Sequence, residues 1–129
     1  MSAKKIIKTS AAPAALGPYS QAVFFENLIF ISGQLGIDLK TEKLPQSIES
    51  QTKNALFHLK NILKTAGATP KNILKVTIFL KNIDDFAVMN AIYEKFFSGD
   101  FPARECVEVS RLPKNAKIEI SAIAGKKDF

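Results

Sequence analysis

The segment Ile73-Leu-Lys-Val-Thr-Ile-Phe-Leu80 decides the fold, because this strand-like run lies between two segments of helical periodicity. Its dense β-branched and aromatic residues predict a strand. Before it, apolar residues recur at helical spacing from Ser47 to Ala66, with Ser47 as the predicted cap. After it, Asp84 is predicted to cap a second helix, which the segment Ser98-Gly99-Asp100 ends. A helix, a strand and a second helix therefore follow one another here.

Shorter strands are predicted on both sides of this region. They are Ile6–Ile7, Ala22–Phe25, Leu28–Ser32, Arg104–Val109 and Lys117–Ala124. Glu26-Asn27 is a predicted hairpin turn, and Ser32-Gly33-Gln34 is predicted to end the third strand. The element order is therefore β, β, β, α, β, α, β, β, and one sheet with both helices on one face is its simplest two-layer arrangement. We predict an α+β fold in one domain, residues 1–129.

The composition excludes several classes of protein. A hydrophobic fraction of 47% is typical of a folded globular chain. No apolar stretch reaches the length of a membrane span, and the start, Met-Ser-Ala-Lys-Lys-Ile-Ile-Lys, lacks the apolar region of a secretory signal. One cysteine and one histidine cannot form a disulfide framework or the usual zinc site within one chain. We therefore expect a cytoplasmic protein without a metal site.

The net charge of +6 permits nucleic-acid binding but does not indicate it. The lysines are scattered along the chain, with no arginine-rich stretch and no basic strand interleaved with aromatic residues. A solvated lysine surface is the simpler interpretation, and nucleic acid is not an expected partner.

The predicted strands at 22–25, 28–32 and 73–80 carry apolar side chains on both faces. The open face of a two-layer protein should instead be polar, and a monomer would expose a large apolar patch. We therefore predict that the open face packs against other copies of the chain in a closed oligomer.

Arginine is rare here, because only Arg104 and Arg111 accompany sixteen lysines. A guanidinium grips a carboxylate through two parallel hydrogen bonds, which an ammonium cannot do. Fifteen residues after Arg104, Glu119 interrupts an apolar, alternating strand. Together they suggest a small anionic substrate and proton transfer. A structural ion pair at a subunit contact is the alternative.

Strand alternation predicts where these side chains point. The isoleucines on either side of Glu119 should face the helices, so Glu119 should face away from them. On the preceding strand Val107 should take the apolar side, so Arg104 and Cys106 should point the opposite way. We therefore expect all three on the open face, on neighbouring strands. If that face is an oligomer interface, their pocket lies between subunits.

Four motifs then resemble one family in order and spacing. They are Gly-Pro-Tyr-Ser-Gln-Ala (17–22), Ile-Ser-Gly-Gln (31–34), Pro-Ala-Arg-x-Cys-Val-Glu-Val (102–109) and Ile-Glu-Ile-x-Ala-Ile-Ala (118–124). Together they resemble the RidA (YjgF) family of reactive intermediate deaminases, and its RidA subgroup in particular. The resemblance implies a chorismate-mutase-like fold and a homotrimer with its sheets packed inward and three clefts between subunits.

The resemblance also implies an activity that needs no cofactor. Family members hydrolyse reactive 2-imino acids or their enamine tautomers, such as 2-iminobutanoate and 2-iminopropanoate, to 2-keto acids and ammonia. Pyridoxal-phosphate enzymes release these intermediates and are damaged by them. The alternatives are an RNA-acting translation inhibitor or endoribonuclease, a label that some relatives have carried, and a non-catalytic small-carboxylate-binding or chaperone-like module.

The motif positions carry expected roles. Arg104 should clamp the substrate carboxylate, and Glu119 should position the attacking water and move its proton, helped by a raised pKa in its apolar strand. The alternative for Glu119 is a salt bridge to Arg104 or Lys117. Glu105, where the subgroup usually has a small residue, should point away from Arg104 and could pair with a lysine.

The remaining binding positions are also implied by the resemblance. Tyr19 should wall the substrate, although it could be a core aromatic residue. Ser32 and Gly33 should form the pocket floor, although a serine there could be a plain turn residue. Asn90 is either a pocket residue or solvent-facing. Cys106 should bind and not act as a nucleophile, because the only histidine, His58, has no link to it and is expected to be a surface or helix-packing residue.

Overall fold

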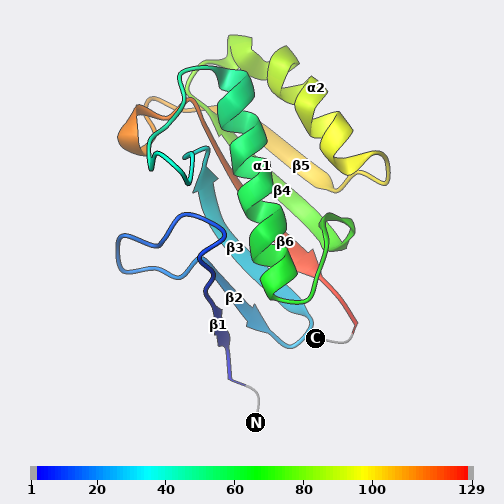
Figure 1. Cartoon of the computed structure of the whole chain (residues 1–129). Coiled ribbons are helices and arrows are strands. Elements are labelled where there is room, and N and C mark those ends of the chain that lie inside the picture. Colours follow the sequence, from blue (N-terminus) through cyan, green and yellow to red (C-terminus); the bar gives the residue numbers. More distant parts are fainter. Residues whose placement is uncertain (1–2, 128–129) are drawn as a thin grey trace.

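The computed structural model describes residues 3–127 and shows one six-stranded sheet with two helices on one face (Figure 1). The elements are β1 (Lys5–Ile7), β2 (Ala22–Phe25), β3 (Leu28–Leu35), α1 (Ile48–Thr65), β4 (Ile73–Leu80), α2 (Phe86–Phe97), β5 (Ala103–Glu108) and β6 (Ile118–Gly125). The predicted α+β class and element order are confirmed. No helix among the described residues is long and apolar enough to cross a membrane.

The strands lie in the order β1-β2-β3-β6-β4-β5. Neighbouring strands are antiparallel except β4 and β5, which the crossover through α2 makes parallel. β5 is consequently an edge strand, and β6 lies between β3 and β4. The strands that carry Arg104 and Glu119 are therefore not neighbours, contrary to the expectation from sequence, because β4 separates them.

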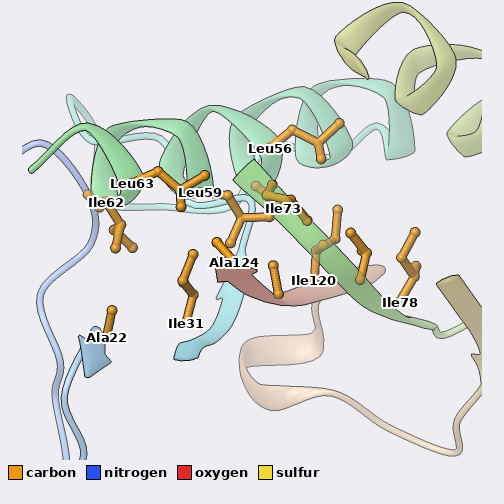
Figure 2. Packing of buried hydrophobic residues seen from close by; sticks show 14 of the residues in the cluster. Ala22, Ile31, Leu56, Leu59, Ile62, Leu63, Ile73, Ile78, Ile120 and Ala124 are labelled. Atoms are coloured by element: carbon orange, nitrogen blue, oxygen red, sulfur yellow. The ribbon is translucent and has the colours of Figure 1, made fainter. Parts of the chain in front are cut away.

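The core lies between α1 and the sheet (Figure 2). Leu59, Ile62 and Leu63 of α1 are fully buried against strand residues such as Ile31 and Ile120. Burying one such side chain contributes about 1.5–3 kcal/mol relative to leaving it exposed. The periodic apolar stripe thus holds the helix on the sheet.

The predicted N-cap of α1 is confirmed, whereas the predicted cap of α2 is wrong. Ser47 accepts a hydrogen bond from the Ser50 N–H at 3.1 Å. Asp84 caps nothing, because it lies inside a 3-10 turn (Ile83–Asp85) that precedes α2. Asn82 caps that turn and accepts from the Asp84 N–H at 2.9 Å, whereas Asp85, which precedes α2, makes no side-chain capping bond. The helix ends at Ser98, whose positive φ of 59° stops it as expected.

β3 does not end at Ser32, because it continues to Leu35 through a bulge. Ile31 pairs with Ala122 and Gln34 with Ile120, so two residues, Ser32 and Gly33, lie opposite one residue of β6. A bulge inserts one extra residue and re-aims the side chains beyond it. The serine and glycine that resemble a turn in the sequence are the bulge itself.

The face of the sheet without helices is apolar over β1 to β3, as predicted, whereas Lys75, Thr77 and Glu105 make its β4–β5 part polar. Ile6, Phe30 and Val107 are 56%, 46% and 47% exposed there. The register places Ile6 beside Val23 and Val23 beside Phe30, so the patch is continuous across the first three strands. The chain alone therefore leaves a large apolar surface facing water.

Candidate active site

Glu119 lies on the open face, directly over the bulge in β3. Its neighbours across the sheet are Leu35 and Phe79. A Cβ atom on Gly33 would be 2.6 Å from Glu119 Oε2, so the carboxylate occupies the space that a side chain at 33 would fill. Half-burial raises the pKa of Glu119, as predicted. Within residues 3–127 of a single chain, neither Arg104 nor Lys117 forms an ion pair with Glu119. The alternative of a salt bridge at Glu119 is therefore wrong for one protomer.

The loop before β2 is tied to the same bulge through Ser32. The Ser32 hydroxyl donates to the Ser20 carbonyl at 2.6 Å, and the Ser32 N–H donates to the Gln21 carbonyl at 2.9 Å. Gln21 in turn orders the loop, because its side chain accepts from the Thr9 N–H at 2.7 Å. Tyr19, next to Ser20, is 54% exposed and is therefore not a core aromatic residue. Ser32 is likewise a strand residue that anchors this loop.

Arg104 lies on the other side of the sheet, beneath α2. Its Nη1 atom donates to Asn90 Oδ1 at 2.7 Å. Its guanidinium carbon is 4.6 Å from the centroid of the Tyr93 ring and 5.5 Å from that of Phe86. Asn90 is half-buried, so the alternative that its side chain simply faces solvent is wrong. Within residues 3–127 no carboxylate lies within ion-pair distance of Arg104.

Cys106 follows Arg104 on the same side of β5. Its register partner in β4 is the fully buried Ile78, and it packs against the edge of the core. Burial raises the pKa of the Cys106 thiol, and the charge of Arg104 offsets part of that effect. The thiol is held in its protonated form, which agrees with a binding position and not with a nucleophile.

The expectation that Arg104, Cys106 and Glu119 share the open face is wrong. Arg104 pairs in register with the buried Val76, so it faces the helices, whereas Val107 is exposed on the open face. The rule that valine points inward fails because β5 is the edge strand. Its helix-covered side offers the guanidinium an amide oxygen and the face of an aromatic ring, whereas Glu105 on the open side of the same strand pairs with Lys75.

The predicted residues therefore form two groups on opposite sides of the sheet. We call Tyr19, Ser32, Gly33 and Glu119 the acid half-site, and Asn90, Arg104 and Cys106 the arginine half-site. Two hollows of 340 and 770 Å³ occur on the described surface, beside Ser32 on the open face and between α1 and α2. Neither is lined by Arg104 or Glu119. One chain does not bring the guanidinium and the carboxylate together.

Two other sequence expectations are settled by the structure. Glu105 points away from Arg104 and pairs with Lys75 at 3.3 Å on the open face. His58 is 2% exposed and bonds to the Ile37 carbonyl through Nε2 at 2.6 Å, so it is a helix-packing residue and not a surface one. Burial is the main cause that lowers the pKa of His58. Among residues 3–127 no cluster of three acidic, histidine or cysteine side chains is arranged to hold a metal ion.

Sequence reasoning missed the part that α2 plays beside Arg104. It gave Asn90 as either a pocket residue or a solvent-facing one, and it connected neither Phe86 nor Tyr93 with the arginine. Residues 86, 90 and 93 lie at spacings of four and three, which places them on one helical face. That spacing was the available signal, but only the structure shows that this face meets a guanidinium.

Comparisons with known proteins agree with the motifs. A protein-family model described as endoribonuclease L-PSP matches residues 9–126. The 2-iminobutanoate/2-iminopropanoate deaminase of Escherichia coli K12 is 48% identical over 123 residues, which are 93% of this chain and 96% of the relative.

Solved structures agree as well. The YjgF gene product of E. coli has a TM-score of 0.92 and 46% identity over 95% of this chain and 98% of that chain. E. coli TdcF, solved with bound serine, has a TM-score of 0.92 and 40% identity over 95% and 98% of the two chains. Because the match spans nearly the whole chain in both sequence and fold, this chain belongs to the RidA (YjgF) family, whose family model is described as endoribonuclease L-PSP.

Proposed function

We propose that this chain is a cytoplasmic homotrimeric hydrolase that deaminates reactive 2-imino acids, such as 2-iminobutanoate and 2-iminopropanoate, to 2-keto acids and ammonia. The observation that carries the proposal concerns Arg104. Its half-buried guanidinium is anchored by Asn90 and has no carboxylate partner among the described residues. The name of the E. coli relative supplies the substrate class. A relative solved with bound serine supports binding of a small amino-acid carboxylate in this fold.

Arg104 takes the substrate carboxylate. Asn90 occupies one of its five N–H donors, which leaves enough of the fork for a two-point contact. The imine carbon is bonded directly to that carboxylate, so the clamp also fixes the position of the reacting atom.

Glu119 accepts a proton from the attacking water and later returns it. Its ionised carboxylate accepts a proton from water while the water oxygen bonds to the imine carbon and the C=N electron pair moves to nitrogen. Glu119 returns this proton to the nitrogen, and the hydroxyl proton of the tetrahedral adduct is also transferred to the nitrogen as the C–N bond breaks. Ammonia leaves and the C=O bond of the 2-keto acid forms. The raised pKa of Glu119 brings the carboxyl closer to the pH at which it must both take and return a proton.

The two half-sites meet only if they come from different protomers. The acid half-site opens on the helix-free face of the sheet, and the arginine half-site lies at the edge strand beneath α2. A closed ring of protomers with their open faces inward covers the apolar patch and brings the edge of one chain to the open face of the next. We therefore place each active site between two protomers of the trimer.

A coupled assay tests the activity. A dehydratase generates 2-iminobutanoate, semicarbazide traps the fraction that escapes, and release of the keto acid is followed with and without the purified chain. We expect wild type to accelerate release and Arg104→Ala to lose about 30-fold or more in kcat/KM, because truncating one partner of a buried charge pair costs about 2–5 kcal/mol. Arg111→Ala, which removes the other, exposed arginine, is the matched control and should keep wild-type activity.

Two results would contradict the proposal. Wild type that fails to accelerate keto-acid release while still binding 2-ketobutyrate would indicate a binding module. RNA cleavage that is unchanged in Arg104→Ala, without imine hydrolysis, would instead favour the activity named in the description of the family model.

A further inference from the structure

The guanidinium of Arg104 is held by three side chains of one helix, α2. Phe86, Asn90 and Tyr93 are spaced four and three residues apart and so share one face of that helix. Asn90 accepts from Nη1 at 2.7 Å, and the rings of Tyr93 and Phe86 lie 4.6 and 5.5 Å from the guanidinium carbon. Tyr93 is the nearer ring.

The Tyr93 ring is itself held in place by burial and by packing against a second ring. It is 3% exposed, and its ring centroid is 4.6 Å from that of Phe97. Phe97 in turn packs edge to face against Phe96 at 5.0 Å. The ring therefore cannot turn away from Arg104 without disturbing the packing at the end of α2.

The chemistry of this contact leaves the cation free to bind a ligand. A carboxylate partner would consume the N–H fork and neutralise the charge, whereas an aromatic ring attracts the flat face of a guanidinium and uses none of its donors. Asn90 takes one N–H, so the other donors stay available. The contacts from α2 therefore orient the Arg104 guanidinium and leave its positive charge without a carboxylate partner among the described residues.

We propose that Tyr93 is a positioning residue: its ring sets the orientation of Arg104 for the substrate carboxylate. This rests on the proposed function, in which Arg104 binds that carboxylate. The ring acts and the hydroxyl does not, because within the described chain the Tyr93 hydroxyl is buried without a hydrogen-bond partner.

The test compares Tyr93→Phe, which keeps the ring, with Tyr93→Leu, which removes it. We expect Tyr93→Phe to behave like wild type. Tyr93→Leu should raise KM for 2-iminobutanoate about tenfold, which is within the range of a desolvated cation–π contact. Its kcat should fall by less than KM rises, because the carboxylate contact is made in both the ground and transition states and only the misplacement of the imine carbon lowers kcat.

A second readout does not depend on activity. Phenylglyoxal modifies arginine, and mass spectrometry can follow Arg104 and Arg111 separately in the intact protein. We expect Arg104 to react several times faster in Tyr93→Leu than in wild type, with the rate at Arg111 unchanged. Because Tyr93 is buried, Phe86→Leu is made as well: Phe86 is 37% exposed, and its loss should shift both readouts in the same direction by less.

The outcomes separate the two proposals. If Arg104 reacts faster in Tyr93→Leu while wild type shows no imine hydrolysis, the positioning role stands and the proposed function falls. Unchanged KM and unchanged Arg104 reactivity in Tyr93→Leu would overturn the positioning role. The same conclusion would follow if Tyr93→Phe were as impaired as Tyr93→Leu. If Tyr93→Leu does not fold, an unchanged Phe86→Leu would also overturn it.

Discussion

Glu119 owes its position to the absence of a side chain at residue 33. The bulge brings the Gly33 Cα beneath the carboxylate, where a Cβ would lie 2.6 Å from Oε2 and 2.9 Å from Cγ. Real Cβ contacts are essentially never that short, so either residue would have to move. Gly33 therefore contributes to the acid half-site through the space it leaves.

A double-mutant cycle tests this dependence. Gly33→Ala is expected to destabilise the protein by about 1 kcal/mol, the low end of the cost of overpacking, because the atoms it meets belong to the Glu119 side chain, which can swing aside. In a Glu119→Ala background most of that loss should disappear, because the atoms that clash are gone. Urea unfolding of the four proteins measures the coupling. Strictly additive effects would show that the carboxylate does not occupy the space over Gly33.

The raised pKa of Glu119 predicts opposite pH trends for stability and activity. Burial favours the protonated form in the folded chain, so this group's stabilisation is complete below its ordinary pKa of 4.5 and is lost as pH rises through the raised value. A reaction that uses the ionised carboxylate gains rate over the same interval. Melting temperature and kcat/KM measured against pH should slope in opposite directions. Glu119→Gln should lose both slopes, and a slope of kcat/KM that persists in this variant would contradict the assignment.

At the scale of elements, α2 is the helix that organises the arginine half-site. The 3-10 turn that precedes it, Ile83–Asp85, is tied to β5, because the Ile83 N–H donates to Glu108 Oε1 at 2.9 Å. Further along, Asn90 and Tyr93 meet Arg104 on the same strand. The contact between this turn and β5 therefore helps to fix how α2 lies over the edge strand.

The capping residue of this 3-10 turn is Asn82. Asn82→Ala should destabilise the protein by about 1 kcal/mol, because it leaves the Asp84 N–H without its acceptor. Asp84→Ala is the matched control and should cost clearly less, because Asp84 contributes only its backbone N–H to this contact. Urea denaturation of both variants checks the difference. Equal losses would argue against the Asn82 cap.

The element order could be predicted from sequence because periodicity and caps are local. Ser47, the apolar stripe of α1 and the strand at 73–80 were all readable in this way. What failed was non-local: nothing in residues 103–108 says that this segment is an edge strand parallel to β4. Without that pairing, alternation alone placed Arg104 on the wrong face. The bulge at Ser32-Gly33 was missed for the same reason, because a bulge is defined by its partner strand.

At the scale of the molecule, two features remain incomplete in one chain. The open face exposes an apolar surface that includes Ile6, Phe30 and Val107. The guanidinium and the carboxylate that the motifs identify lie on opposite sides of the sheet. Association of protomers through the open face would complete both.

Mixing two inactive variants tests this account most directly. Arg104→Ala and Glu119→Ala chains are refolded together in equal amounts and assayed for 2-iminobutanoate hydrolysis, with each variant refolded alone as the control. If each site takes Arg104 from one protomer and Glu119 from the next, random assembly restores about a quarter of the sites and about a quarter of the wild-type activity. A mixture no more active than the separate variants would contradict a site shared between protomers.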